Sequence, residues 1–318
     1  MKNQIYIGRT VGAFLLVLLL MPMGHALMIL MEHFLALDAL HYCSFAIGFA
    51  GMVIVIMGMY VKGDAKQTLF GLFGGLLFWT GWVEFLFAYY AWRYGVHCDL
   101  VGDGIVQTTT TYLNGVGVNH DFLINGESLE AFTRPELKAI RGSRPEYLIM
   151  PATFGMWMMM AMLYLFGTRT GCRFFCWLQN HLHLRQVHAP QPGMVRHSSL
   201  VTFLELNMMM WTFYIVLMFC YDPVFLGSSH PVTFGVGFAC LVSSAFMLWK
   251  QLHVAAWGAN IRMAVATVLV FWTFVEVVAR NGLLNEIWVD PMNHIAEMLI
   301  ILAAFVVVSA VLFKKRKR

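Results

Sequence analysis

Charged residues are scarce in this chain. Asp, Glu, Lys and Arg make up 12% of its 318 residues, whereas 59% are hydrophobic and the mean hydropathy is +0.68. Soluble globular proteins have about 25% charged residues, so 17 acidic and 21 basic side chains are too few to cover a 36.1 kDa protein in water. The scarcity excludes a secreted domain, a disordered chain and a soluble Rossmann or barrel enzyme. It leaves a polytopic membrane protein.

Recognisable catalytic motifs are absent from the sequence as well. The chain has no Walker loop, GxSxG elbow, HExxH helix, CxxCH haem site or histidine box of the membrane desaturases. Its six cysteines form no framework, because Cys172 and Cys176 are four residues apart and fit neither a CxxC redox pair nor a zinc ribbon. A function must therefore be sought in residues that are unusual for their surroundings.

Long apolar stretches are what the chain does contain. A bilayer core about 30 Å thick needs roughly 20 apolar residues in a helix. Eight stretches qualify, at residues 11–31, 42–61, 69–92, 148–166, 200–221, 232–249, 263–279 and 295–313. The first is too long for the apolar part of a signal peptide and no Ala-x-Ala site follows it, so we expect it to stay as a helix. The sequence predicts an all-α membrane bundle with eight transmembrane helices.

Basic residues predict how the bundle is oriented. Fifteen of the 21 Lys and Arg residues fall in the two tails and in the connections that follow the second, fourth and sixth helices. Asp64 is the one acid in those connections, whereas nearly all other loop carboxylates lie on the opposite side. The positive-inside rule then places both termini in the cytoplasm, as an even number of helices requires. We expect a multi-pass protein of the cell inner membrane.

The chain is expected to form a single transmembrane domain over residues 1–318, with two long connections. Residues 94–146, between the third and fourth helices, would form an extracytoplasmic loop or cap with Gly-rich turns and a short helix near 127–139. Residues 168–198 would form a basic cytoplasmic loop. The tail from Lys314 to Arg318 directly follows an apolar helix, so it indicates a stop-transfer anchor that touches anionic lipid, and no nucleic-acid partner is expected.

Ionisable side chains inside the apolar stretches are the candidates for function. A charge at mid-depth costs about 2.5–3.5 kcal/mol on insertion scales, so such residues need a partner or a purpose. Most of them lie towards the predicted extracytoplasmic ends of their helices. They are Glu32 and His33 in the first, His41 in the second, Glu84 in the third, Glu276 and Arg280 in the seventh, and Asp290, His294 and Glu297 in the eighth.

Spacing along two of these helices favours a metal site. Asp290, His294 and Glu297 are related by steps of four and three, so we expect them along one helix face with Asp290 as the N-cap. In the first helix His25 and Glu32 are seven residues apart and share a face. Imidazole with carboxylate suits a transition metal better than calcium. The predicted ligands are Asp290, His294, Glu297, Glu32, His33, His41 and His25, for iron, copper or zinc.

Each of these residues also has a structural interpretation. Asp290 on its own could do no more than cap the eighth helix, and Glu276 with Arg280, four residues apart, could be an ion pair that stabilises the seventh. Glu84 resists such an interpretation, because the residues around it from Phe78 to Phe87 are bulky and apolar. We expect Glu84, Glu276 and Arg280 to be the reactive residues.

Three classes of function remain open. The first is a metal-dependent oxidoreductase whose site lies near the extracytoplasmic face and takes a small or lipid-like substrate. The second is an ion-coupled transporter in which Glu84, Glu276 and Arg280 relay protons or bind the solute. The third is a non-catalytic subunit of a membrane complex, with partner membrane subunits or further copies of itself. All three depend on acids and imidazoles that converge from helices distant in the chain.

Overall fold

The chain folds into a bundle of long apolar helices. The computed structural model describes residues 4–87, 89, 100–101, 104–113, 116–124, 127–128, 153–162, 181, 197–221, 226–285, 287–288 and 290–314. Within these residues the helices are α1 (Ile7–Phe34), α2 (Leu37–Tyr60), α3 (Asp64–Phe78) with a π-helical continuation η1 (Trp79–Glu84), α7 (Phe154–Met162), α9 (Ser198–Tyr221), α10 (Pro231–Gln251), α11 (Trp257–Arg280) and α12 (Ile295–Lys314).

Six helices of the described part are long and apolar enough to cross a bilayer: α1, α2, α3 with its continuation to Phe87, α9, α10 and α11. They correspond to six of the eight predicted stretches. At the stretch 148–166 the structure has α7, and the rest of that stretch lies outside the described residues. At the last stretch the apolar part of α12 covers Ile295–Ala310 and is shorter than the six. The chain is a multi-pass helical membrane protein.

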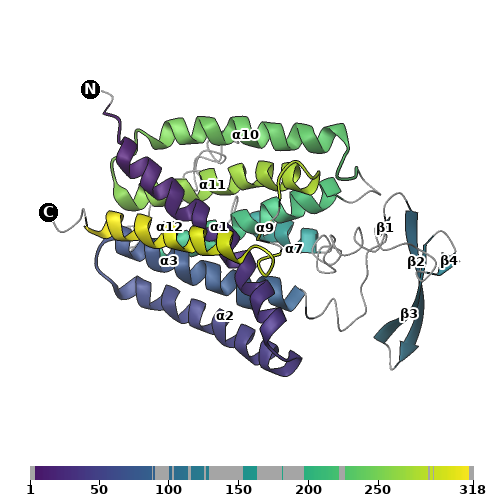
Figure 1. The fold of residues 1–318 in the computed structure, drawn as a ribbon. Helices are drawn as coiled ribbons and strands as arrows, with labels where there is room; N and C mark the ends of the chain where they lie inside the picture. Colours follow the sequence, from purple (N-terminus) through teal and green to yellow (C-terminus); the bar gives the residue numbers. More distant parts are fainter. Residues whose placement is uncertain are drawn as a thin grey trace.

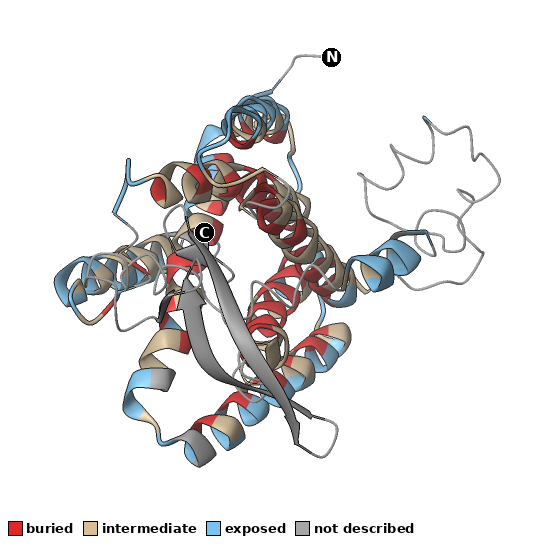
Figure 2. Ribbon diagram, turned by 90° about the vertical axis from the view of Figure 1, so that its right-hand side faces the viewer, coloured by how far each residue is buried: buried red, intermediate tan, exposed pale blue. Residues whose placement is uncertain are grey.

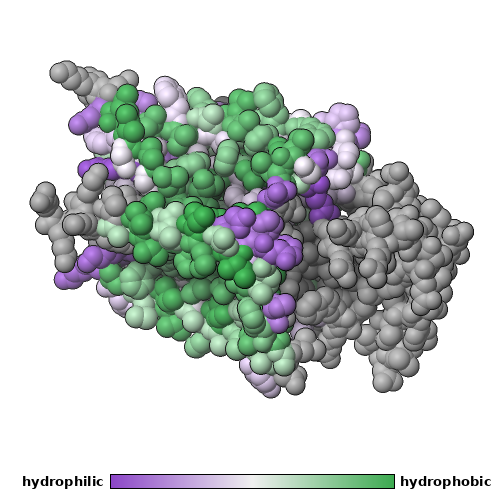
Figure 3. Space-filling view, in the orientation of Figure 1, coloured by the Kyte–Doolittle hydropathy of each residue, from purple (hydrophilic) through white to green (hydrophobic). Residues whose placement is uncertain are grey.

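Consecutive helices run in opposite directions, so their starts and ends gather at two ends of the bundle. In Figure 1 both chain termini lie at one end, and α1, α3 and α11 begin there. Seen along the bundle in Figure 2, buried residues line the inner faces of the helices and exposed residues lie outside. Figure 3 shows a broad apolar surface across the helices, with hydrophilic residues towards the ends. This distribution is typical of a protein surrounded by lipid.

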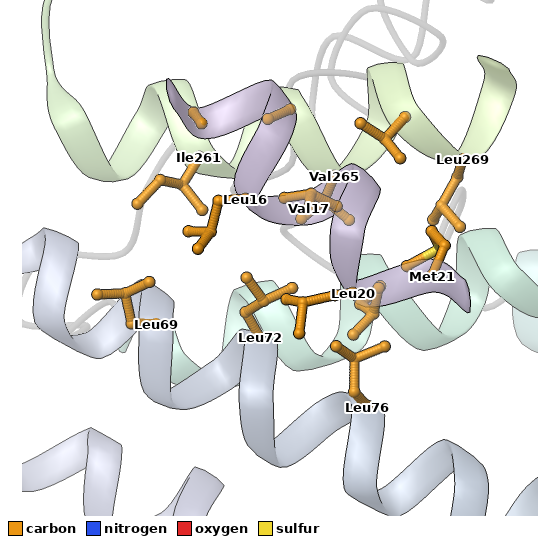
Figure 4. Close-up of a cluster of buried hydrophobic side chains, with 14 residues drawn as sticks. Leu16, Val17, Leu20, Met21, Leu69, Leu72, Leu76, Ile261, Val265 and Leu269 are labelled. Atoms are coloured by element: carbon orange, nitrogen blue, oxygen red, sulfur yellow. The ribbon is translucent and has the colours of Figure 1, made fainter. Parts of the chain in front are cut away.

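The core forms where α1 crosses between α3 and α11. Figure 4 shows Leu16, Val17, Leu20 and Met21 of α1 between the leucines of α3 and the aliphatic side chains of α11. Leu72 and Ile261, from the two flanking helices, have no exposed surface. Other apolar side chains of α1, such as Val11 and Leu15, are exposed on the surface that lipid would cover, so the helix is apolar all round instead of along one stripe.

Glycines bring α2 and α3 into close contact. A Cβ atom at Gly51 would lie 2.6 Å from the carbonyl oxygen of Gly74, and one at Gly74 would lie 2.6 Å from the oxygen of Gly51. A Cβ atom at Gly81 in η1 would collide with the α2 backbone at Gly48 and Ser44. Small residues allow such approach, and dispersion contacts then hold the helices together where lipid removes the hydrophobic driving force.

The connection between the third and fourth predicted helices contains a four-stranded antiparallel sheet. Its strands are β1 (Leu100–Val101), β2 (Gly104–Leu113), β3 (Val116–Ile124) and β4 (Glu127–Ser128), in the order β1-β2-β3-β4. In Figure 1 the strands lie beyond the end of the bundle at which α3 ends. The predicted short helix near 127–139 is wrong at Glu127 and Ser128, which are strand. The remainder of 127–139 lies outside the described residues.

Candidate intramembrane cavity

Two predicted site residues on different helices, His25 of α1 and Glu84 of η1, are in contact. The Nδ1 atom of His25 lies 3.1 Å from the Oε1 atom of Glu84. The two side chains are 18% and 8% exposed. The two atoms are within ion-pair distance, but Oε1 of Glu84 accepts no hydrogen bond within the described residues, so the contact is an ion pair when the imidazole is protonated.

The helix backbone is irregular on both sides of this pair. Pro22 lies inside α1, one turn before His25, and a proline cannot donate the helical hydrogen bond to the residue four positions earlier. Glu84 is the last residue of the π-helical segment η1, and such segments occur often at functional sites. Within η1, Gly81 packs on α2, whereas Glu84 reaches His25 on α1. The local sequence therefore turns an acid towards the inside of the bundle.

A cavity of about 120 Å³ lies beside the pair. Four of the ten predicted site residues line it: His25, Glu84, Glu276 and Arg280. Thr80 and Thr273 add hydroxyl groups. The remaining lining is apolar, with methionines and leucines from α1, α3, α9 and α11 and six aromatic residues, Trp79, Phe213, Tyr214, Tyr221, Trp272 and Trp288. A mostly apolar cavity with a few convergent polar groups is the usual form of a small-molecule site.

Aromatic side chains position the two ionisable residues of α11. The indole N–H of Trp272 donates a hydrogen bond to Oε1 of Glu276, at 2.8 Å and four residues along the helix. The guanidinium of Arg280 lies over the ring of Tyr221, 5.4 Å from its centroid. Trp288, from the connection that follows α11, packs against Trp272 with ring centroids 4.8 Å apart. This buried indole covers the cavity from the side of the connection.

Asp290, His294 and Glu297 do not line the cavity. Asn293 donates to the carboxylate of Asp290 at 2.7 Å, and Nδ1 of His294 lies 3.3 Å from Oε1 of Glu297. The helix α12 begins at Ile295, so Asp290 lies in the turns before it. The expected N-cap at Asp290 is therefore wrong, and the three residues do not share one helix face. The turn arises because Asn293 and Asp290 satisfy each other locally.

His33 and His41 also lie apart from the cavity lining. The ring of His41 packs against Tyr89, with centroids 4.6 Å apart, and that of His33 packs against Phe34 at 5.0 Å. The side chain of Glu32 lies outside the described residues. In the part of the chain that the structure describes, no three His, Cys, Asp or Glu residues lie close enough together to hold a metal ion.

Sequence reasoning missed the aromatic lining. Trp272 carried a usable signal, because it precedes Glu276 by four residues and so lies on the same helix face. Trp288 and Tyr221 carried none, since they come from other elements.

Comparison of the chain with protein-family models, with curated proteins and with solved structures gives no match. The function must be argued from the cavity itself.

Proposed function

We propose that this protein is a carrier that moves a small molecule across the membrane, either in exchange for protons or together with them. The observation that supports it most is the buried contact between His25 and Glu84, on two different helices, at the wall of a cavity. Ionisable residues within membrane helices mark proton relays and solute sites more often than they serve stability. The pair would hold the coupling proton, and the cavity would hold the solute.

We also propose the membrane placement predicted from the charges. In this proposal eight helices span the inner membrane, both termini are cytoplasmic, and the segment 94–146 is extracytoplasmic. Support comes from the basic residues, fifteen of which fall on one predicted side. The cavity would then lie towards the extracytoplasmic ends of α1, α9 and α11, with surrounding lipid as the first partner.

Charge compensation gives the coupling its physical basis. An uncompensated charge in the bundle would cost several kcal/mol, because a low-dielectric interior does not replace its hydration. A charged solute can therefore enter beside Glu84 only if a proton leaves, or beside Arg280 only if a proton arrives. The irregular backbone at Pro22 and η1 suits a carrier, since interrupted helices are tolerated where they line a cavity.

The test is proton movement in proteoliposomes that contain a trapped pH indicator. Small cationic, neutral and anionic solutes are added in turn, with the full-length protein or its variants in the membrane. We expect one solute class to drive proton movement that Glu84→Gln abolishes while the protein remains folded. Glu205→Gln is the matched control, because Glu205 is a half-buried acid on α9 outside the cavity lining. If no solute moves protons, or if Glu84→Gln transports normally, the carrier proposal fails.

The donor set of the pair favours a second candidate, a metal-dependent oxidoreductase. An imidazole and a carboxylate 3.1 Å apart are two ligands of the kind that iron, copper or zinc binds. Metal analysis of the purified protein, alongside His25→Ala, Glu84→Gln, Asp290→Ala and His294→Ala, decides this point. A stoichiometric metal lost in the first two variants would favour the enzyme. Loss of the metal in Asp290→Ala and His294→Ala would instead place the metal site at the turns before α12.

A further inference from the structure

The cavity lining also indicates which class of solute it takes. Resting on the proposed carrier function, we infer that the solute is a small organic ammonium cation, which displaces the proton held by His25 and Glu84.

Six of the residues that line the cavity are aromatic. Three indoles, two phenols and one phenyl ring line a cavity of only about 120 Å³. The face of such a ring attracts a cation, most strongly when the cation has lost its water, and cages of aromatic rings bind quaternary ammonium groups. The lining already contains one cation–π contact, since the guanidinium of Arg280 lies over the ring of Tyr221.

The charged groups of the lining give the same preference. Two carboxylates, Glu84 and Glu276, oppose one guanidinium, Arg280. Within the described part of the chain, the other titratable side chains of the lining are the phenols of Tyr214 and Tyr221 on α9. Among the described lining residues, carboxylates therefore outnumber guanidinium groups, which favours a cation over an anion.

The size of the cavity limits the cation. An engineered apolar cavity of about 150 Å³ admits benzene, so 120 Å³ suits a molecule with about five non-hydrogen atoms. Tetramethylammonium has this size.

Charge balances in the exchange without any external reactant. Before binding, His25 would carry the proton as an imidazolium beside the carboxylate of Glu84. As the ammonium group settles against that carboxylate, the proton leaves for water and His25 remains neutral. One positive charge replaces another, no covalent bond other than the one to the proton is broken, and the low-dielectric site keeps its net charge.

Three probes of equal size separate charge from shape. Tetramethylammonium, tert-butanol and propionate have the same number of non-hydrogen atoms and are cationic, neutral and anionic. Their binding to the full chain in detergent is followed by tryptophan fluorescence, which reports on the indoles of the lining, and proton release is measured in unbuffered solution. We expect tetramethylammonium to bind at least tenfold more tightly than either other probe. Its binding should release one proton and tighten as pH rises.

Substitutions assign the binding to the cavity. Trp272→Leu should weaken tetramethylammonium binding about tenfold. Trp272→Phe also loses the N–H group but keeps an aromatic ring, so it should bind tetramethylammonium nearly as tightly as the parent protein. Trp249→Leu changes an exposed indole on α10 outside the lining and should have no effect. Glu84→Gln should remove the proton release. If Trp272→Leu and Trp272→Phe weaken binding equally, the aromatic cage is wrong.

Failure of this inference differs from failure of the carrier proposal. Tighter binding of propionate, or affinity that rises as pH falls, overturns the cation and leaves proton-coupled carriage in place with an anion. Equal binding of tert-butanol and tetramethylammonium also overturns it. Conversely, cation binding with proton release in detergent, but no proton movement in proteoliposomes, supports the cation inference and ends the carrier proposal.

Discussion

Arg262 on α11 and Asp64 at the start of α3 form an ion pair, with Nη1 2.9 Å from Oδ1. The same carboxylate oxygen accepts a hydrogen bond from the hydroxyl of Ser198, at the start of α9, at 2.6 Å. Arg262 also donates to the hydroxyl of Thr68. One carboxylate therefore joins three helices at the end of the bundle opposite the cavity.

Asp64→Asn should lower the free energy of unfolding by about 1 kcal/mol. The amide keeps the shape of the side chain but loses the charge that holds Arg262, and the carboxylate is 46% exposed, which limits the loss. Unfolding in mixed detergent micelles, followed by tryptophan fluorescence, measures the change. Lys66→Gln on the same turn is the control and should be neutral, since Lys66 is exposed. Equal stability of Asp64→Asn and the parent protein would show that the three helices do not depend on this contact.

Gly51→Ala should destabilise the packing of α2 on α3 by about 1–3 kcal/mol, the usual cost of overpacking. The added methyl group would meet backbone atoms of Gly74 and Phe78, which cannot rotate away. Gly8→Ala is the matched control, because nothing lies within 4 Å of a Cβ atom there and alanine favours a helix. A neutral Gly51→Ala would mean that the two helices lie farther apart than the structure has them.

Asn260→Ala should cost about 1–3 kcal/mol, because it leaves buried polar groups without their partner. The Nδ2 atom of Asn260 donates to the hydroxyl of Thr10 and to the carbonyl oxygens of Gln251 and Val254, and its Oδ1 atom accepts from Gln251. The side chain is fully buried. The same micelle titration measures the loss, and Asn285→Ala, at an exposed position, supplies the comparison. Loss of stability no greater than in Asn285→Ala would contradict the network.

The multi-pass architecture was predictable because the thickness of a bilayer is encoded directly as a length of apolar sequence. The sheet was not predicted, although two signals for it exist. Asn114-Gly115 separates β2 from β3, and Asn125-Gly126 separates β3 from β4. Asn-Gly between two strands is the strongest short-range hairpin signal. The threonines of β2 are polar, so this strand does not stand out as an apolar run.

The site was predictable as a set of residues but not as a set of contacts. Scarcity of charge singled out His25, Glu84, Glu276 and Arg280, since each stands in apolar sequence. Spacing then grouped His25 with Glu32 on its own helix, whereas its contact in the structure is Glu84 on another. Which residues of different helices meet depends on close approaches such as Gly81 on α2, and on the π-helical turn before Glu84. A periodicity of 3.6 residues contains no information about either.

Reporter fusions test the proposed orientation. A fluorescent protein fused after residue 318 should fluoresce, because it folds in the cytoplasm, and alkaline phosphatase inserted within 94–146 should be active, because it requires the extracytoplasmic side. The expectation follows from the fifteen basic residues of one predicted side. An active phosphatase at the C-terminus would contradict both the orientation and the even number of helices.

The contact between His25 and Glu84 is most directly tested by nitrogen NMR of the histidine side chains in ¹⁵N-labelled protein. The His25 signal is assigned by its disappearance in His25→Gln. Because Nδ1 lies 3.1 Å from Oε1 of Glu84, we predict that Glu84→Gln shifts the Nδ1 resonance of His25, whereas Glu205→Gln leaves it in place. A His25 resonance that is unchanged by Glu84→Gln would contradict the pair, and with it the proton site on which the proposed carrier depends.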